Sequence, residues 1–492
     1  MNFPQQPEEL PADSKAYKWK AMATVAMGAL MASIDFSITN IAFPTLTRTF
    51  NRELTTVMWV TVAYVLVSCS STLVLGKISD LIGRRKIYTL GMAVFTLGLA
   101  ACSLAQGIGQ LVLFRSFQAL GAAMVISCGA AIVIEAFPPK EIGKGLGILG
   151  MFVSIGFIIG PALGGVLLDW LEWRSIFYVR IPVGILALLM GLVLLRKDQR
   201  AKTAFRLDLL GTLTSSAGIF SLVFGIGQLR HFGTRSPLSY LIMGFGLLFL
   251  VLFVLVERHA KDPIVDMSLF RNRIFSSASA ALFLNFVAAP PFILLIPFYF
   301  MQGIGLTPSE TGLLLAIHSV STIVVGPLSG SLSDRFGAAW FATAGAAAST
   351  VAFLLMLTFH LETSVGWIVS VLILLGVGIG GFQAPNNSTI MAAVARDRLG
   401  SASALIATLR QVGISLGMAL AGTFYSARLS VHQAKLSTVG IGNAAAKAIP
   451  LAFHDVLLIS VLTGGAVILF SLLTLGTHAV RRDTPPRSPE SV

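Results

Sequence analysis

Charged side chains inside long apolar runs are the residues of this sequence best placed to do chemistry. Asp35 stands about fourteen residues into the apolar run 21–44, and Arg115 stands four residues into the run 111–137. A charge at membrane depth is costly, so such a residue usually faces a partner or a water-filled cavity. Burial and a nearby cation act in opposite directions on the proton affinity of a carboxyl group. We therefore predict that Asp35 binds and releases a proton, with Arg115 close enough to tune it.

Two simpler interpretations remain open at this stage. Asp35 and Arg115 could form a static ion pair between two helices, or Arg115 could snorkel toward the headgroups. Arg115 cannot release its own proton at accessible pH, so any part it has in proton coupling acts through Asp35. Glu135, at the other end of the run 111–137, could be an inner station of a proton path or an interfacial residue near Lys140 or Lys144.

Several further polar side chains interrupt apolar runs and are candidates for the wall of a substrate cavity. For the amides, hydrogen bonding between helices is the alternative to a cavity role. The candidates are Asn40, Arg180, Asn285, Gln383, Asn386, Asn387, Arg410 and Gln411.

A short charged turn occurs twice in the chain, each time between two apolar runs. The first copy is Gly76–Lys86, with Gly76, Asp80, Gly83, Arg84 and Arg85, and the second is Gly330–Gly337, with Asp334 followed by Arg335. The repetition predicts two related halves, as in many secondary transporters. We expect Asp80 to lie at the N-terminal end of the helix that begins near Ser401 and Ser403, where the helix dipole stabilises a carboxylate and a gating contact can form.

Glycines at 156, 160 and 164 lie on one face of a helix, followed by Gly165 and interrupted by Pro161. A face of small residues lets a neighbouring helix approach at backbone distance. This pattern predicts a tight seam, which we expect at the junction between the halves, where it would prevent ion leakage.

The elements that position these residues are membrane helices. Of 492 residues, 55% are hydrophobic and 12% charged, against about 25% charged in a soluble domain. The three cysteines lie in apolar runs and offer neither a disulfide framework nor metal-ligand spacing. A membrane helix needs about 20 apolar residues. Fourteen runs qualify: 21–44, 55–75, 87–105, 111–137, 145–168, 175–195, 209–229, 238–256, 274–301, 309–332, 339–358, 365–394, 403–426 and 453–477.

The basic residues sort by side of the membrane. The termini and the loops after even-numbered spans hold 24 of the 35 Lys and Arg, the other loops hold 8, and Arg115, Arg180 and Arg410 lie within spans. The positive-inside rule then places both termini in the cytoplasm, and the net charge of +13 needs no nucleic-acid partner.

The expected domains are a cytoplasmic segment 1–20, a six-helix bundle 21–200, an inserted helix pair 201–260, a second six-helix bundle 261–477 and a disordered tail 478–492. The polar start of the chain does not read as a cleavable signal peptide.

These motifs, in this order, resemble the major facilitator superfamily, specifically its fourteen-span drug:proton antiporter branch. The similarity rests on Asp35–Pro44, Gly76–Lys86, Leu113–Gly121, Gly156–Gly165 and Arg410–Gly413. It implies an all-helical fold of two six-helix bundles plus two helices, proton coupling through Asp35 and Arg115, and an antiporter motif at Gly156–Gly165. Two departures are Arg180, where the branch usually has asparagine, and Ala338-Ala339-Trp340, where the first turn has basic residues.

We expect a proton-coupled antiporter that exports amphipathic or aromatic compounds by alternating access. The alternatives are an exporter of a particular anionic or lipid-like metabolite, favoured by three arginines within spans, and a non-transporting membrane sensor. No nucleophile, metal or cofactor site supports an enzyme, and no P-loop supports nucleotide use. The partners expected are a small-molecule substrate, protons and lipid, for a monomer in a bacterial cytoplasmic (inner) membrane.

Overall fold

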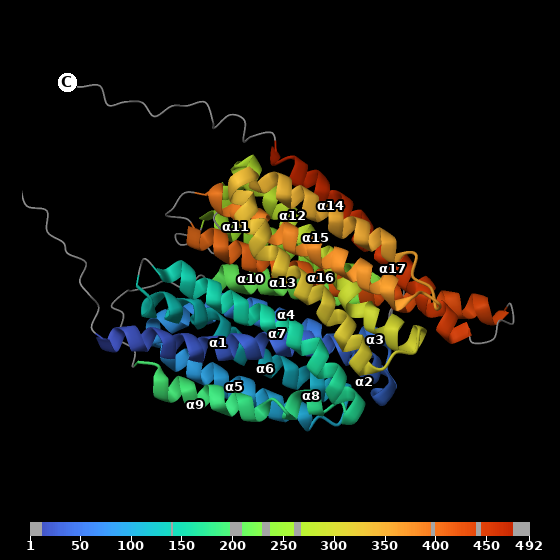
Figure 1. Cartoon of the computed structure of the whole chain (residues 1–492), viewed down its shortest axis with the longest axis horizontal. Coiled ribbons are helices and arrows are strands. Elements are labelled where there is room, and N and C mark those ends of the chain that lie inside the picture. Colours follow the sequence, from blue (N-terminus) through green and yellow to red (C-terminus); the bar gives the residue numbers. More distant parts are fainter. Residues whose placement is uncertain are drawn as a thin grey trace, which may run out of the picture. The chain divides into compact units, whose positions relative to one another are not determined.

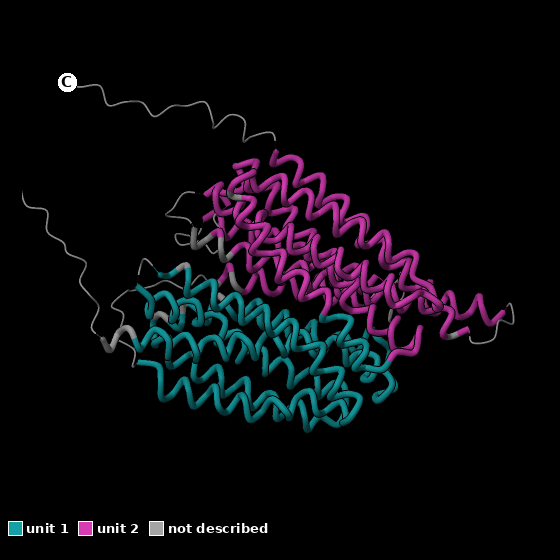
Figure 2. Tube along the Cα trace, in the orientation of Figure 1, with its two compact units in different colours: residues 1–207, 307–316 teal, residues 208–306, 317–492 magenta. Residues whose placement is uncertain are grey.

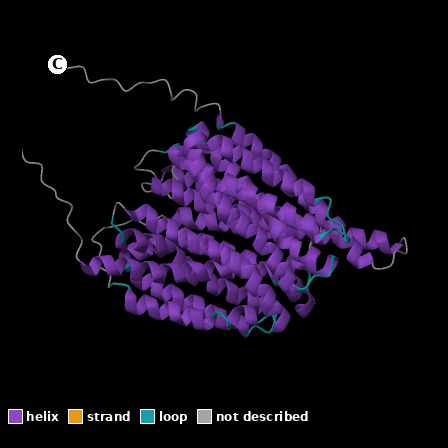
Figure 3. Ribbon diagram, viewed as in Figure 1, coloured by secondary structure: helices purple, strands orange, loops and turns teal. Residues whose placement is uncertain are grey.

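The described part of the chain consists of long helices (Figure 1). The computed structural model describes residues 12–138, 141–196, 209–228, 237–259, 267–394, 399–438 and 444–475. Every regular element within those ranges is helical (Figure 3). All of the predicted tail 478–492 and the start of the predicted segment 1–20 fall outside the described residues.

Thirteen helices in the described ranges are long and apolar enough to cross a membrane. The fourteenth expected span corresponds to α10 (Leu209–Gln228), whose apolar part, Leu213–Gln228, is shorter than the 18 residues required. The predicted fold class, an all-helical multi-pass membrane protein, is confirmed, and a count of fourteen spans is compatible with this structure.

The described helices group into two compact units, coloured separately in Figure 2. Unit 1 comprises residues 1–207 and 307–316, so it includes the first turns of α13 (Pro308–Phe336). Its other helices are α1 (Ala12–Ile41), α2 (Phe43–Phe50), α3 (Leu54–Val57), α4 (Trp59–Ile82), α5 (Arg84–Ser103), α6 (Ile108–Ala136), α7 (Ile142–Trp170), α8 (Ser175–Tyr178) and α9 (Ile181–Leu194).

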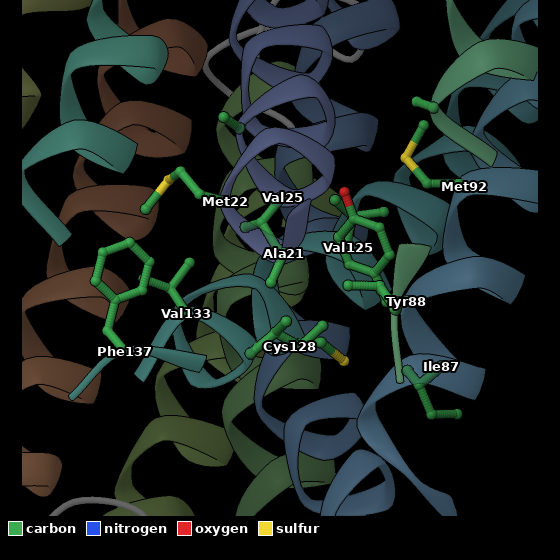
Figure 4. Packing of buried hydrophobic residues seen from close by; sticks show 14 residues of the cluster. Ala21, Met22, Val25, Ile87, Tyr88, Met92, Val125, Cys128, Val133 and Phe137 are labelled. Atoms are coloured by element: carbon green, nitrogen blue, oxygen red, sulfur yellow. The ribbon is translucent and has the colours of Figure 1, made fainter. Parts of the chain in front are cut away.

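The core of unit 1 forms where α1, α5 and α6 meet (Figure 4). Met22 and Val25 of α1 pack with Tyr88 of α5 and Val125 of α6. The hydroxyl of Tyr88 donates a hydrogen bond of 2.8 Å to the carbonyl of Thr24, which satisfies the polar tip of a fully buried ring. This core fixes α1, the helix that carries Asp35, against its neighbours.

Unit 2 comprises residues 208–306 and 317–492. It includes α10, the rest of α13 and a 3₁₀ turn at Met267–Arg271, and α12 continues into a π-helical turn at Tyr299–Gly303. Its remaining helices are α11 (Pro237–His259), α12 (Arg273–Phe298), α14 (Ala338–Met356), α15 (Val365–Ala392), α16 (Leu399–Thr438) and α17 (Ala444–Leu472).

The expected insertion, α10 and α11, groups with unit 2. The hydroxyl of Thr423 in α16 donates to the carbonyl of Ile226 in α10 at 3.3 Å. The pair is therefore held to the second bundle by packing as well as by chain connection.

The repeated charged turn has the same backbone geometry in both units. Gly83 has φ 119° and ψ 132°, and Gly337 has φ 102° and ψ 124°. In each turn the glycine N–H donates to a serine carbonyl four residues earlier at 2.9 Å, from Gly83 to Ser79 and from Gly337 to Ser333. A positive φ of this size favours glycine, because a Cβ would clash with the backbone. The two turns are structural copies of each other.

Candidate functional site

Asp35 is fully buried in α1, and two arginines share its carboxylate. Arg115 Nη1 lies 2.6 Å from Oδ2, and Arg180 Nη1 lies 2.7 Å from Oδ1. Gln118 Nε2 donates to Oδ1 at 3.0 Å. The exposed fraction of the side chain is 0% for Asp35, 0% for Arg115 and 3% for Arg180. We call these three residues the charge cluster.

The local structure around each arginine explains its position. Arg115 and Gln118 are three residues apart on α6, so they lie on the same helix face. Gln118 Oε1 also accepts from Arg115 Nη1 at 2.8 Å, which fixes both side chains relative to Asp35. Arg180 is the N-cap residue of α9 at the break between α8 and α9, and its Nε donates to the carbonyl of Ile176 at 2.6 Å.

Aromatic rings line the charge cluster. The guanidinium carbon of Arg115 lies 4.2 Å from the ring centroid of Tyr64 in α4, and the Tyr64 hydroxyl faces the Asp35 carboxylate. Phe177 lies 6.0 Å from Arg115 and 5.9 Å from Arg180, measured from each guanidinium carbon to the ring centroid. Cation–π contacts of this kind stabilise a guanidinium that has lost its water.

The charges and hydrogen bonds of the cluster do not balance. Two arginines face one carboxylate, so the buried cluster carries one excess positive charge. Arg115 Nη2 and Arg180 Nη2 are buried and have no hydrogen-bond partner among the described residues. Buried polar groups are normally satisfied, and a buried charge is normally paired. A carboxylate that has two cationic partners can keep one and release the other. A site that couples proton binding to another event requires such an exchange of partners.

The glycine face of α7 packs against α1, within unit 1. A Cβ built on Gly156 would lie 2.6 Å from the Cβ of Ser33, and one built on Gly160 would lie 1.8 Å from the Oγ of Ser37. A Cβ on Gly164 would lie 2.6 Å from Ile38 Cγ1. Backbone-close packing is thus present, but its partner is the helix that carries Asp35.

The other two residues of this predicted motif face the start of α13. A Cβ on Gly165 would lie 2.3 Å from the carbonyl oxygen of Pro308, and a Cβ on Gly312 would lie 2.3 Å from that of Pro161. Asp169 accepts a hydrogen bond from the backbone N–H of Ser309 at 2.8 Å.

The first charged turn is tied into unit 1 by its basic residues. Arg84 Nη1 lies 2.6 Å from Oε1 of Glu135, and Arg85 donates to the carbonyl of Leu192. Glu135 is therefore an interfacial ion-pair partner, with Arg84 rather than Lys144 as its cation. Its 62% exposed side chain lies apart from the charge cluster.

The remaining gating residues are only partly described. Gly76 is half-buried and Gly83 caps α4, while Arg335 is exposed at the end of α13. The side chains of Asp80, Asp334, Ser401 and Ser403 lie outside the described part of the structure, so the expected contact of Asp80 stays a prediction.

The predicted cavity residues fall into three groups. Arg180 belongs to the charge cluster, so the structure brings it to Asp35. Asn386 donates to the carbonyl of Ala278 at 3.1 Å, which links α15 to α12 as a helix–helix hydrogen bond. The others are placed without such a role: Asn40 and Asn285 are buried, Gln383, Asn387 and Gln411 are half-buried, and Arg410 is exposed with its guanidinium carbon 5.2 Å from the ring centroid of Phe286.

Two members of the site had no predicted role. Gln118 bridges Arg115 and Asp35, and Tyr64 contacts both. The spacing of Gln118 three residues after Arg115 was a usable signal, because polar residues at that spacing share a helix face. Tyr64 gave no such signal in a run of apolar residues.

Comparison with known proteins places the chain among membrane transporters. The sequence model of the family described as Major Facilitator Superfamily matches residues 25–418. The chain is 32% identical over 416 residues to the riboflavin transporter RibZ of Clostridioides difficile (strain 630), covering 85% of this chain and 90% of that protein. It is 34% identical over 412 residues to the multidrug resistance protein Stp of Mycobacterium tuberculosis, covering 83% and 76%.

Solved structures agree on the fold. A bacterial homologue of the human lysosomal transporter Spinster, in an inward-facing and unoccupied conformation, matches with a TM-score of 0.68 at 17% identity. The match covers 94% of this chain and 98% of that chain. At this identity the likeness concerns the fold alone.

Proposed function

This chain belongs to the major facilitator superfamily and is a membrane transporter, and we propose that it is a proton-coupled antiporter that exports amphipathic or aromatic compounds. The observation that carries the proposal is the buried carboxylate of Asp35 held by two arginines. Names of relatives also favour export: besides Stp, the chain is 27% identical over 411 residues to the tetracenomycin C resistance and export protein of Streptomyces glaucescens.

A proton cannot be added to the closed charge cluster without a large penalty. With Asp35 neutral, Arg115 and Arg180 would be two buried cations with no counter-ion between them. An uncompensated buried charge destabilises a protein by about 3–5 kcal/mol. Proton uptake by Asp35 therefore accompanies separation or hydration of the cluster, and closure of the cluster expels the proton.

The same equilibrium can couple the proton to an exported compound. If the compound binds better to the conformation in which the cluster is closed, its binding releases a proton from Asp35. Reciprocity requires that protonation then weakens binding by the same factor. Competition of this kind is the thermodynamic basis of antiport.

The packing of α1 supplies a mechanical link. Gly156, Gly160 and Gly164 hold α7 at backbone distance from α1, so the two helices move as one body. A shift of this pair relative to α6 changes the separation between Asp35 and Arg115 directly.

The distribution of Lys and Arg supports cytoplasmic termini, in a bacterial cytoplasmic membrane. We propose a monomer, because each unit has a core of its own.

The test is proton release and gradient-driven transport by the purified full-length protein. Ethidium and riboflavin serve as probes, the second because a relative carries riboflavin in its name. In weakly buffered detergent solution, addition of a transported probe should release protons. In proteoliposomes an imposed pH gradient should drive the same probe.

Asp35→Asn should abolish both signals, whereas the matched acid-to-amide change Glu172→Gln, at an exposed position, should keep them. Gradient-driven transport that survives in Asp35→Asn would overturn the proposed coupling.

A further inference from the structure

The two arginines of the charge cluster have donors to spare. Arg115 uses Nε on the carbonyl of Val60 at 3.3 Å and Nη1 on Asp35 and Gln118, and Arg180 uses Nε on Ile176 and Nη1 on Asp35. Both Nη2 groups are buried without a partner. A guanidinium offers a planar fork that matches a carboxylate with two parallel hydrogen bonds. Neither arginine makes that fork with Asp35, because each touches a single oxygen through one nitrogen.

The net charge of the cluster also favours an anionic ligand. Among the described residues, Asp35 is the one acid paired with either arginine. The cluster therefore keeps one excess positive charge at a depth where water is scarce, which favours an anion over a cation as its ligand.

We propose that Arg115 and Arg180 form a recognition site for an acidic group, a carboxylate or a comparable singly charged oxyanion, on an aromatic compound, which displaces Asp35 as their counter-ion. The Tyr64 and Phe177 rings beside the guanidinium groups would receive the aromatic part. The proposal rests on the proposed function, because it assigns to the same cluster a further class of ligand, one that binds together with a proton instead of competing with it.

Displacement of Asp35 from the two arginines determines whether ligand binding takes up or releases a proton. The titratable and charged groups that face Asp35 are Tyr64 from α4, Cys102 from α5, Arg115 from α6 and Arg180 from the start of α9. Once a bound anion takes both arginines, Asp35 loses its cations while still buried and accepts a proton. The total charge of the cluster is then unchanged, since one anion and one proton enter together. An acidic ligand thus binds with proton uptake, whereas the exported neutral or cationic compounds of the proposed function bind with proton release.

The experiment uses three ligands with one ring system and different charge: 1-naphthoate, 1-naphthamide and 1-naphthylmethylammonium. Binding to the full-length protein in detergent is measured by calorimetry at several pH values, and protons are counted with an indicator dye in weak buffer. We expect 1-naphthoate to bind at least about 10-fold more tightly than 1-naphthamide, as for loss of one charge-assisted contact. Its affinity should rise as the pH falls, with uptake of about one proton per bound ligand.

Three variants locate the site. Arg180→Gln should remove the preference for 1-naphthoate over 1-naphthamide, while the matched change Arg174→Gln, at a partly exposed arginine, should keep that preference. Asp35→Asn removes the competing carboxylate. It should tighten 1-naphthoate binding by about 10-fold and abolish its pH dependence and proton uptake. Melting curves check that each variant is folded. If Arg180→Gln is unstable, the result for Asp35→Asn decides the test.

The outcomes separate this proposal from the proposed function. Equal affinity for the three ligands, or proton release on 1-naphthoate binding, overturns the acidic-group site and leaves antiport of other compounds intact. Arginine-dependent 1-naphthoate binding with proton uptake, but no gradient-driven transport of any probe by the wild type, supports the site and contradicts the antiporter.

Discussion

Arg180 Nη1 lies 2.7 Å from Asp35 Oδ1, on the opposite carboxylate oxygen from the one that Arg115 contacts at 2.6 Å. The position at which the resembled branch usually has asparagine therefore holds a second cation against Asp35, the acid that we propose couples the proton. From sequence, Arg180 was expected in a substrate cavity and had no predicted part in proton coupling. The geometry now predicts the contrary.

Arg180→Asn should change the pH dependence of transport. With one cation removed, the cost of protonating Asp35 falls, because Arg115 alone remains opposite it. The pH at which Asp35 loses its proton should rise, so proton release on substrate addition should occur at higher pH than in wild type. Indicator-dye titration of proton release against pH, in wild type, Arg180→Asn and Arg174→Asn, gives the measurement. Identical titrations for all three proteins would show that Arg180 does not act on Asp35.

Gly160 should be the least replaceable glycine of α7. Among the glycines that face α1, it has the shortest clash: a Cβ there would meet Ser37 Oγ at 1.8 Å and Ser37 Cβ at 2.9 Å, so Gly160→Ala forces α1 and α7 apart. Overpacking of this kind costs about 1–3 kcal/mol. We expect a lower melting midpoint and weaker transport.

Two companion variants make the Gly160 test specific. Gly150→Ala changes a glycine of the same helix at which an added Cβ would meet no atom of the surrounding structure within 4 Å, and it should be tolerated. Ser37→Ala removes the first clash, so the double variant Ser37→Ala with Gly160→Ala should recover part of the lost stability. If Gly150→Ala and Gly160→Ala melt alike, close packing of the two helices is not what the glycine protects.

The pair Lys18–Glu141 should give unit 1 a small stability term that depends on pH. Lys18 Nζ lies 2.5 Å from Glu141 Oε2, and this hydrogen bond holds the pKa of the Glu141 carboxyl below its usual value. An acid with a lowered pKa in the folded state adds stability above its unfolded pKa, and that stability is lost as the pH falls through the folded pKa. The difference in melting midpoint between wild type and Glu141→Gln should be present at pH 7, begin to shrink below the unfolded pKa of about 4.3, and vanish once the pH has fallen through the lower folded pKa.

High salt should also reduce that difference, because both side chains are partly exposed. Glu362→Gln provides the control at an exposed acid that has no ion pair among the described residues. A difference between wild type and Glu141→Gln that grows on acidification would contradict the ion pair.

Much of the fold and two of the three residues of the charge cluster follow from sequence, for definable reasons. Apolar length alone locates membrane helices, and charge sorting orders them. Asp35 and Arg115 are predictable partners because each is too costly to leave alone at membrane depth. Arg180 obeys the same rule, but its direction depends on the break between α8 and α9, which places it at the start of a helix beside α1. Periodicity along one helix cannot supply that information.

Partners chosen across helices are equally hidden from sequence. Glu135 pairs with Arg84 of α5, although basic residues closer in sequence were the expected partners. The glycines spaced four residues apart in α7 predict a close helix contact, but they do not identify the partner helix. The structure shows that this partner is α1. Tertiary packing decides such pairings, and a single sequence without its fold leaves them open.

The last prediction concerns the two structurally equivalent turns. Gly83 has φ 119° and Gly337 has φ 102°, so alanine at either position is strained whatever space surrounds it. Such strain costs about 1–3 kcal/mol per residue. Gly83→Ala and Gly337→Ala should each lower the melting midpoint by a similar amount, since the backbone geometry is the same in both turns. Gly107→Ala is the control, because Gly107 has φ −154° and an added Cβ would meet no atom of the surrounding structure within 4 Å.

The variants of the two turns should differ in transport, although they lower the melting midpoint by similar amounts. The first turn anchors Arg84 on Glu135 and Arg85 on the carbonyl of Leu192, whereas the second is followed by Ala338, Ala339 and Trp340. Straining Gly83 therefore disturbs an ion pair and a backbone contact that have no counterpart in sequence at Gly337. Transport rates measured at a temperature where both variants are folded should fall further for Gly83→Ala than for Gly337→Ala. Equal losses would mean that the basic residues of the first turn serve only to orient the chain in the membrane.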